Sequence, residues 1–179
     1  MTCLSVSKEQ YKSIIEKPFC GFDSVEFAEL NKHKVDEVKY FIFGDKANHF
    51  ALVAGIKDKV LKCPFSATFG IFSEIRQNNQ INYYYDAISS LIAWCKDNDI
   101  KKIIFATPPL FYNQSHITKF QNALFCFGFK ILHYDINFEF CLDDSTNYHN
   151  LINRNSKRKL KIAYDGIILQ CLNSEVQMA

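Results

Sequence analysis

The sequence predicts a mixed α/β domain in which helices flank a central, largely antiparallel sheet. Three observations support this fold class. Of 179 residues, 48% are hydrophobic and 22% are charged, which is typical of a chain with a packed core and excludes intrinsic disorder. Only 6 glycines and 4 prolines occur, which favours a few long elements over many tight turns. Stretches with a period of 3.6 residues alternate with stretches with a period of two.

The first residues predict two short helices, preceded by a short strand at residues 3–6. Ser7 is expected to cap the first helix, which Pro18 would end. Asp23 or Ser24 is expected to cap the second helix, because short polar side chains accept hydrogen bonds from the first N–H groups of a helix.

Three extended stretches follow. Residues 37–44 and 49–56 are rich in β-branched and aromatic side chains, and the polar residues between them predict a turn. Residues 60–72 predict a third strand that is interrupted at Pro64. Since proline donates no backbone hydrogen bond, it fits a sheet edge or a bulge, and the sheet is expected to resume over residues 69–72.

The next elements alternate between helix and strand. Apolar side chains at helical spacing predict a helix over residues 80–96, and the apolar run at 101–106 is typical of a buried central strand. A further helix is expected over residues 115–127, with Ser115 as its N-cap and Gly128 just past its end.

The clearest strand pattern covers residues 130–142, where apolar and polar side chains alternate strictly. The composition then becomes polar and basic, which predicts a helix that ends near Gly166 and a short strand at 167–172. We therefore expect one domain over residues 1–144, followed by a basic helix and a short strand over residues 145–179.

Charge and cysteine content narrow the function classes. A net charge of +2 is too small to indicate a nucleic-acid or membrane partner by itself. No stretch approaches the ~20 apolar residues of a membrane span, and we see no secretory signal. The 7 cysteines show no CxxC spacing and the 5 histidines show no HxxxH or HxH pair, so we expect no metal site and reduced thiols in a cytoplasmic protein.

Four segments resemble motifs of one known family, and they occur in the family's order. The segments are Pro64–Gly70, Ile104–Tyr112 with its proline pair, the helix-to-strand junction Ala123–Phe129, and the basic stretch Leu151–Ala163. Together with the element order, they are similar to the FemAB-like branch of the Gcn5-related N-acetyltransferase (GNAT) superfamily. These relatives are the aminoacyl and acyl transferases of cell-envelope assembly.

The resemblance implies a GNAT-like fold and the transfer of an acyl or aminoacyl group to an amine of a cell-envelope precursor or amino sugar. It implies acyl-CoA or aminoacyl-tRNA as the donor, and a cleft where the sheet parts between the stretches that end near Phe72 and Ala106. FemAB-like proteins usually carry two such domains in tandem, and this chain has the length of one. Residues 145–179 would then begin a second domain.

An alternative interpretation is a catalytically degenerate GNAT-like domain that serves as a protein-interaction module. The partner would be a second domain, another chain or a second copy in a homo-oligomer. The short length and the departures from the family's site motifs, described next, favour this alternative.

The first of these departures lies in the segment that corresponds to the family's acyl-CoA loop. The family signature, R/Q-x-x-G-x-G/A, uses glycines so that the backbone approaches the phosphates, whereas this segment has no glycine. A solvated polar turn ahead of a helix is the alternative interpretation. The residues expected to bind the cofactor are Phe72, Ser73, Ile75, Arg76, Gln77, Asn78 and Asn79.

Two residues are expected to be catalytic. Glu74 lies at a strand end and could act as a base, and Tyr112 follows a strand's C-terminal end, where α/β sheets often place ligands. Leu124 occupies the position at which many acetyltransferases carry a tyrosine acid, and it cannot donate a proton. His116 and Ser115 are not expected to form a base–nucleophile pair, because adjacent helical residues point in different directions.

The basic stretch holds the one charge cluster of the sequence. Arg154, Lys157 and Arg158 are expected to contact phosphates of a tRNA, a nucleotide-linked sugar or an anionic lipid carrier. Two alternatives remain open for this stretch, namely a solvated helix face and a nucleic-acid-binding module.

Overall fold

The computed structural model describes residues 1–77, 79–137 and 152–166. The chain divides into two compact units, Met1–Asn137 and Phe138–Ala179. The described part of the second unit contains the helix α6 (Arg154–Gly166). The first unit contains, in order, β1 (Thr2–Val6), α1 (Lys8–Ile14), η1 (Gly21–Asp23), α2 (Val25–Asn31), η2 (Lys32–Lys34), β2 (Glu37–Gly44), β3 (Asn48–Lys57), β4 (Val60–Cys63), β5 (Ser73–Glu74), α3 (Ile81–Asp97), β6 (Lys102–Phe105), η3 (Leu110–Tyr112) and α4 (Gln114–Cys126).

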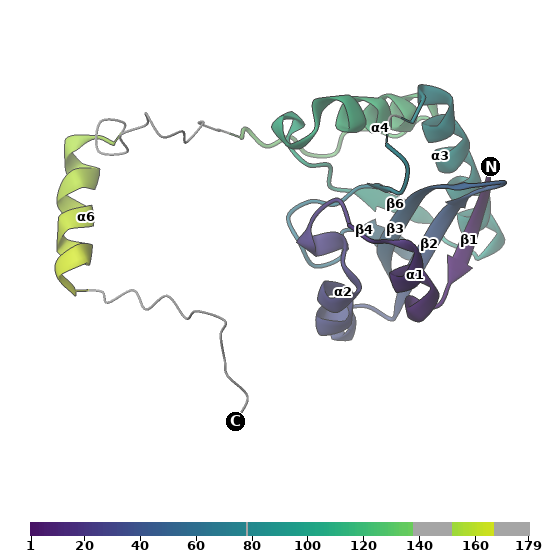
Figure 1. Ribbon diagram of the computed structural model, residues 1–179, viewed down its shortest axis with the longest axis horizontal. Coiled ribbons are helices and arrows are strands. Elements are labelled where there is room, and N and C mark those ends of the chain that lie inside the picture. The colour runs from purple at the N-terminus through teal and green to yellow at the C-terminus, as the bar shows by residue number, and fades with distance from the viewer. Residues whose placement is uncertain (78, 138–151, 167–179) are drawn as a thin grey trace. The chain divides into compact units, whose positions relative to one another are not determined.

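The strands form one mixed sheet in the order β1-β2-β3-β4-β6, and β5 pairs with β3 (Figure 1). The pairs β1–β2, β2–β3, β3–β4 and β3–β5 are antiparallel, whereas β4 and β6 are parallel. A parallel pair needs a crossover connection, and α3 lies within it. The arrangement confirms the predicted mixed α/β class.

Alternation of side chains along β2 and β3 gives the sheet two buried faces. One face packs against α3 and α4, and the other face packs against α1 and α2 (Figure 1). The sheet is therefore the middle of three layers. The first face presents Phe41, Phe43, Phe50, Leu52 and Ala54, and the second presents Tyr40, Ile42, Ala51 and Val53.

Side-chain caps fix the helix starts. Ser7 and Gln10 form a reciprocal capping box at α1, and the Ser24 hydroxyl accepts a hydrogen bond from a first-turn N–H of α2. The Ser7 prediction is confirmed, and of the two candidates for α2 the cap is Ser24. At α4 the prediction is wrong, because Asn113 and not Ser115 caps the helix. Gly128 follows α4 with a positive φ of 80°, as expected for a residue just past a helix end.

The third predicted strand is interrupted at Pro64 as expected, but it resumes later than predicted. β4 ends at Cys63, and pairing with β3 returns only at Ser73, so residues 69–72 are not a strand. Residues 60–62 and 73–74 thus lie along the same edge of β3, and the chain between them leaves the ladder. Proline has no N–H with which to continue the ladder.

Two other strand predictions are wrong. β6 was expected to be central, yet it is the last strand of the described sheet and is only partly buried. Residues 130–137 form no strand, and their apolar side chains are exposed. Alternation shows that a segment is two-sided, but a strand also needs a neighbouring edge, and none pairs with this segment among the described residues. Residues 138–142 and 167–172 lie outside the described residues.

The predicted basic helix is present as α6. Searched over the described ranges, the chain has no helix that is long and apolar enough to cross a membrane.

Candidate functional site

The sheet opens past the paired ends of β4 and β6. Their register runs to Cys63 and Phe105, and Ala106 N then donates to Cys63 O (2.9 Å) while Gly70 N donates to Ala106 O (2.9 Å). Beyond this point one segment turns to pair with β3 as β5, and the other leaves the sheet through residues 107–112. In the described structure no backbone hydrogen bond joins the two segments past Gly70.

A cavity of about 720 Å³ lies beside β5. The loop after α1, the end of β5, the first turns of α3 and the first turns of α4 all contribute side chains to its wall. Ionisable residues from all four segments meet there, which distinguishes the cavity from the apolar core below it. They are Glu16, Lys17, Glu74, Tyr84, His116 and Lys119.

Glu74 faces the cavity and is held by two neighbours. Its Oε1 accepts hydrogen bonds from Tyr84 OH (3.0 Å) and from Asn79 Nδ2 (3.2 Å). Its Oε2 lies 3.6 Å from His116 Nδ1, which is beyond hydrogen-bond distance, and accepts no hydrogen bond from any described residue. Glu74 is 19% exposed, whereas His116 is 1% exposed. One carboxylate oxygen is therefore fixed and the other is open.

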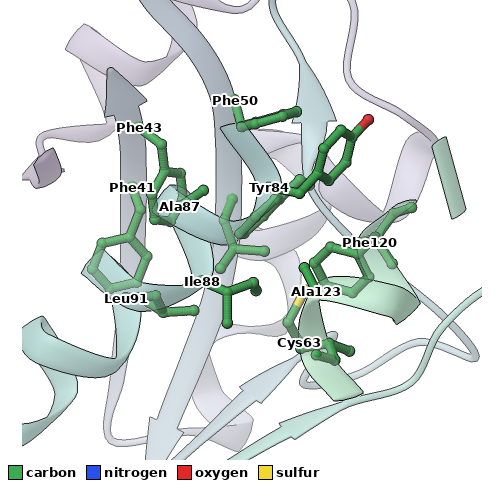
Figure 2. Close-up of a cluster of buried hydrophobic side chains, with 14 of the residues drawn as sticks. Phe41, Phe43, Phe50, Cys63, Tyr84, Ala87, Ile88, Leu91, Phe120 and Ala123 are labelled. Carbon is green, nitrogen blue, oxygen red and sulfur yellow. The ribbon is translucent and has the colours of Figure 1, made fainter. Parts of the chain in front are cut away.

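Tyr84 and His116 lie behind Glu74. The Tyr84 ring packs against Phe50 of β3, with 4.6 Å between the ring centroids, and its hydroxyl points away from the labelled core side chains (Figure 2). That hydroxyl lies 2.7 Å from His116 Nδ1, and His116 Nε2 lies 2.7 Å from the carbonyl oxygen of Phe72. Glu74 at the cavity is thereby connected through Tyr84 to a fully buried imidazole.

The acceptors fix where protons lie in this cluster. Because a carbonyl oxygen only accepts, His116 Nε2 carries a proton, and Nδ1 of the neutral ring is an acceptor. The Tyr84 hydroxyl has one hydrogen, but both His116 Nδ1 and Glu74 Oε1 lie within its reach. One added proton, on His116 or on Glu74, satisfies both contacts. The cluster can therefore take up one proton and pass it between Glu74 and His116 through Tyr84.

Burial shifts the pKa of two members of the cluster. Burial lowers the pKa of His116, and the Glu74 charge and the contact with the Phe72 carbonyl oppose this shift. Burial also raises the pKa of Tyr84, and the adjacent Glu74 carboxylate raises it further. Tyr84 therefore keeps its proton and acts as a conduit, while a neutral His116 can accept the proton that is relayed to it.

The residues expected to bind the cofactor lie in different environments: some are buried in the core, some form hydrogen bonds within the fold, and some are exposed to solvent. Phe72 is buried in the core, the Ser73 hydroxyl accepts from Phe19 N (2.8 Å), and Ile75 N donates to His49 O (2.9 Å). Arg76 and Gln77 are exposed, Asn79 is buried, and Asn78 lies outside the described residues.

The described residues of this segment, 72–77 and 79, offer no site for a pyrophosphate. Asn79 is buried, and its side-chain amide donates to the Arg76 carbonyl and to Glu74 instead of pointing outward. The backbone carbonyl of Asn79 is bonded by Lys119 (3.0 Å). With no glycine to let a phosphate approach and a carboxylate among its neighbours, the described part of the segment lacks the features of a phosphate cradle.

The other expected catalytic residue lies elsewhere. Tyr112 belongs to η3, is 54% exposed, and packs its ring against Phe69 and Phe111, both at 4.9 Å between ring centroids. It does not line the cavity that contains Glu74. The structure thus does not bring the two residues into one site.

The expected phosphate-binding residues lie in the second unit. Arg154, Lys157 and Arg158 are in the first turns of α6, and all three are exposed. Their side chains are thus accessible to an anionic partner.

Tyr84, Lys119 and the role of His116 were missed by the sequence reasoning. His116 was judged only against its neighbour Ser115, which is exposed and does not cap the helix. A usable signal existed, because His116 lies one turn before Phe120 in the apolar stripe of α4. A lone polar side chain in such a stripe must find buried partners, and these are Tyr84 and the Phe72 carbonyl.

No protein-family model matches the chain, and no significant match was found among curated proteins or solved structures. Within the described residues, no group of three His, Cys, Asp or Glu side chains could hold a metal ion. The site itself offers an open carboxylate oxygen, a proton relay behind it and an ammonium group in the same cavity.

Proposed function

We propose that this chain transfers an acyl or aminoacyl group to an amine, with Glu74 as the base that takes a proton from the acceptor. The observation that supports this most is that Glu74 lines the cavity and that its Oε2 accepts no hydrogen bond from a described residue, while Oε1 is fixed by Tyr84 and Asn79. A positioned carboxylate with a free lone pair suits removal of a proton from an ammonium group. The motif resemblance supports the reaction class and the acceptor, an amine of a cell-envelope precursor or amino sugar.

In the proposed reaction, the acceptor ammonium gives one proton to Glu74, and the nitrogen lone pair attacks the carbonyl carbon of a thioester or ester donor. A C–N bond forms and the C–S or C–O bond breaks. The leaving thiolate or alkoxide departs with its electron pair and receives the second proton lost by the nitrogen. Tyr84 and His116 act on the first proton, which they can accept from Glu74 and return.

For the acyl donor, the proposed reaction involves only the carbonyl group and the leaving group attached to it. Because the described residues of the segment before α3 offer no site for a pyrophosphate, we assign no step to acyl-CoA. Arg154, Lys157 and Arg158 would contact the phosphates of a nucleotide-linked or tRNA-linked substrate. Binding through them should weaken steeply with salt, with each neutralised phosphate contact contributing to the slope.

Mass spectrometry of amide products tests the proposal. We would incubate the protein with a panel of amines and two donors, acetyl-CoA and a short acetyl thioester without the nucleotide. We expect amide formation with both donors and a roughly 10²- to 10⁴-fold loss in Glu74→Gln, the usual contribution of a general base. Glu9→Gln, an exposed carboxylate on α1, is the matched control. Equal rates for wild type and Glu74→Gln, or no amide product from any pair, would refute the proposal.

A second candidate function is favoured by a different observation. Residues 130–137 carry four exposed apolar side chains, from 60% exposure at Ile131 to 82% at Tyr134, with Leu132 and Ile136 between these values. Several large apolar side chains exposed close together in the sequence are a feature of interaction sites. For the interaction module, we propose self-association through this segment. Light scattering should show a dimer that Leu132→Ser with Ile136→Ser converts to a monomer, and a wild-type monomer at all concentrations would contradict it.

A further inference from the structure

Of the charged side chains that line the cavity, Glu74 and Lys119 have opposite charge and open hydrogen-bonding capacity, and Glu16 and Lys17 line the same cavity. Glu74 presents its free Oε2, as described above. The Lys119 ammonium is half-buried, and it donates to the backbone carbonyl of Asn79 at 3.0 Å. No carboxylate of the described residues lies within 4.0 Å of it. A half-buried ammonium that uses one of its three donors on a carbonyl is suited to bind an anion.

Asn79 contacts both Glu74 and Lys119 and so limits how far apart their charges lie. Its side-chain amide contacts Glu74 Oε1 at 3.2 Å, and its backbone oxygen contacts Lys119 Nζ at 3.0 Å. Five bonds of about 1.2–1.5 Å join these two Asn79 atoms, which therefore lie no more than roughly 6 Å apart. The carboxylate and the ammonium are therefore separated by no more than one residue and two hydrogen bonds.

A small zwitterion is short enough to fit within this upper limit. The ammonium and carboxylate of an amino acid lie about 3 Å apart, and two charge-assisted hydrogen bonds of about 2.8 Å extend this reach to the range that Asn79 allows. Glu74 would receive the ammonium and Lys119 would receive the carboxylate. His116 lies one turn before Lys119 on α4, so the relay and the cationic group face the ligand from the same helix.

We propose that the cavity binds an amino-acid-like ligand, whose ammonium pairs with Glu74 and whose carboxylate pairs with Lys119. If the ligand takes part in the reaction, it is the acceptor amine, and this part of the inference rests on the proposed function. The acceptor would then carry a free carboxylate within a few bonds of the reacting nitrogen. Lys119 would determine specificity, because an amine without the carboxylate would leave this ammonium unpaired in a half-buried position.

Ligand-observed NMR without any acyl donor tests the inference. The probes are pools of the twenty amino acids, the amines that correspond to them after loss of the carboxylate, and the acids that correspond to them after loss of the amino group. We expect at least one amino acid to bind at least about tenfold more tightly than its matched amine and acid. Glu74→Gln and Lys119→Met should each weaken that binding by at least about tenfold. Lys119→Arg should retain most of it, since the charge and donors remain.

The control is Lys96→Met, an exposed lysine at the end of α3, which should bind as the wild type does. Circular dichroism and the melting temperature establish that each variant is folded. The inference is overturned if no amino acid binds, if the matched amine binds equally well, or if folded Lys119→Met binds as the wild type. Failure of the acyl-transfer assay alone leaves it standing, because binding is measured without a donor. Conversely, transfer to carboxylate-free amines that is unaffected by Lys119→Met overturns the inference and leaves the proposed function.

Discussion

Asp23 makes the stability of the fold depend on pH, and Asp23→Asn is expected to remove that dependence. Asp23 is 1% exposed, and its Oδ2 accepts a hydrogen bond from Cys20 Sγ at 3.2 Å. Its Oδ1 lies so close to Gly70 that a Cβ on that glycine would be only 2.8 Å away. Burial raises the pKa of Asp23 from 3.8 to about 7, and hydrogen bonds from Cys20 oppose only part of the shift.

The sign of the effect follows from proton binding. In the unfolded chain Asp23 loses its proton near pH 4, whereas in the folded protein it keeps the proton until about pH 7. The folded state therefore binds more protons between these values, and stability falls as pH rises from 4 to 7. At about 1.4 kcal/mol for each pKa unit, the loss amounts to about 4 kcal/mol and is complete above pH 7.

Asparagine has nearly the same shape and cannot ionise, so the variant should escape this loss. We expect Asp23→Asn to have about the wild-type stability near pH 4.5 and to become more stable than wild type by up to about 4 kcal/mol at pH 8.5. Urea unfolding at several pH values, followed by Trp94 fluorescence and circular dichroism, measures the difference.

Asp99→Asn is the control. Hydrogen bonds from Lys101 and Lys59 lower the pKa of Asp99 to about 2, so this carboxyl stays ionised in folded and unfolded states throughout the pH range used. The variant should therefore keep the wild-type dependence on pH. If the stability difference between wild type and Asp23→Asn stays constant within about 1 kcal/mol from pH 4.5 to 8.5, the carboxyl is not desolvated and the reasoning is refuted.

The same unfolding measurement tests three further substitutions. Lys59 has a positive φ of 60° in the turn between β3 and β4, so Lys59→Gly should be more stable than Lys59→Ala by about 1 kcal/mol, since both variants lose the ion pair with Asp99; equal stability of the two variants would contradict that origin of strain. Leu91→Ala should cost about 2–5 kcal/mol because the side chain is 1% exposed, and a cost below 1 kcal/mol would show that the core collapses around it. Gly55→Ala should cost about 1–3 kcal/mol, since the new methyl group would lie 2.5 Å from the Phe65 ring, and a neutral effect would mean that Phe65 moves away freely.

Helices and strands whose signals lie within their own residues could be predicted from the sequence. The β2–β3 hairpin, α1, α3 and the end of α4 each carry their own periodicity, cap or glycine, and all were predicted within a few residues. The edge position of β6 and the absence of a strand over residues 130–137 could not be predicted in this way. They depend on which segments lie beside them, and periodicity contains no information about neighbours.

The candidate site, too, could be predicted only in part from the sequence. Glu74 could be proposed because a carboxylate at a strand end is visible in the sequence. Its partners Tyr84 and His116 lie on two different helices and are 32 residues apart in the chain, and only the packing of α3 against α4 brings them together. Tyr112 was selected by the same reasoning about strand ends, but it does not line the cavity, because its ring packs against Phe69 and Phe111 instead.

The parallel pairing of β4 with β6 has a consequence for how the chain folds. The hairpins formed by β2, β3 and β4 can close from local turns, whereas β6 reaches its place only after residues 64–101 have closed a long loop around α3. Contacts that are distant in sequence form slowly, because the entropy of loop closure opposes them before they stabilise anything. We infer that the meeting of Tyr84 with His116 is a late event in folding, so that a nascent chain has an ordered sheet before its proton relay exists.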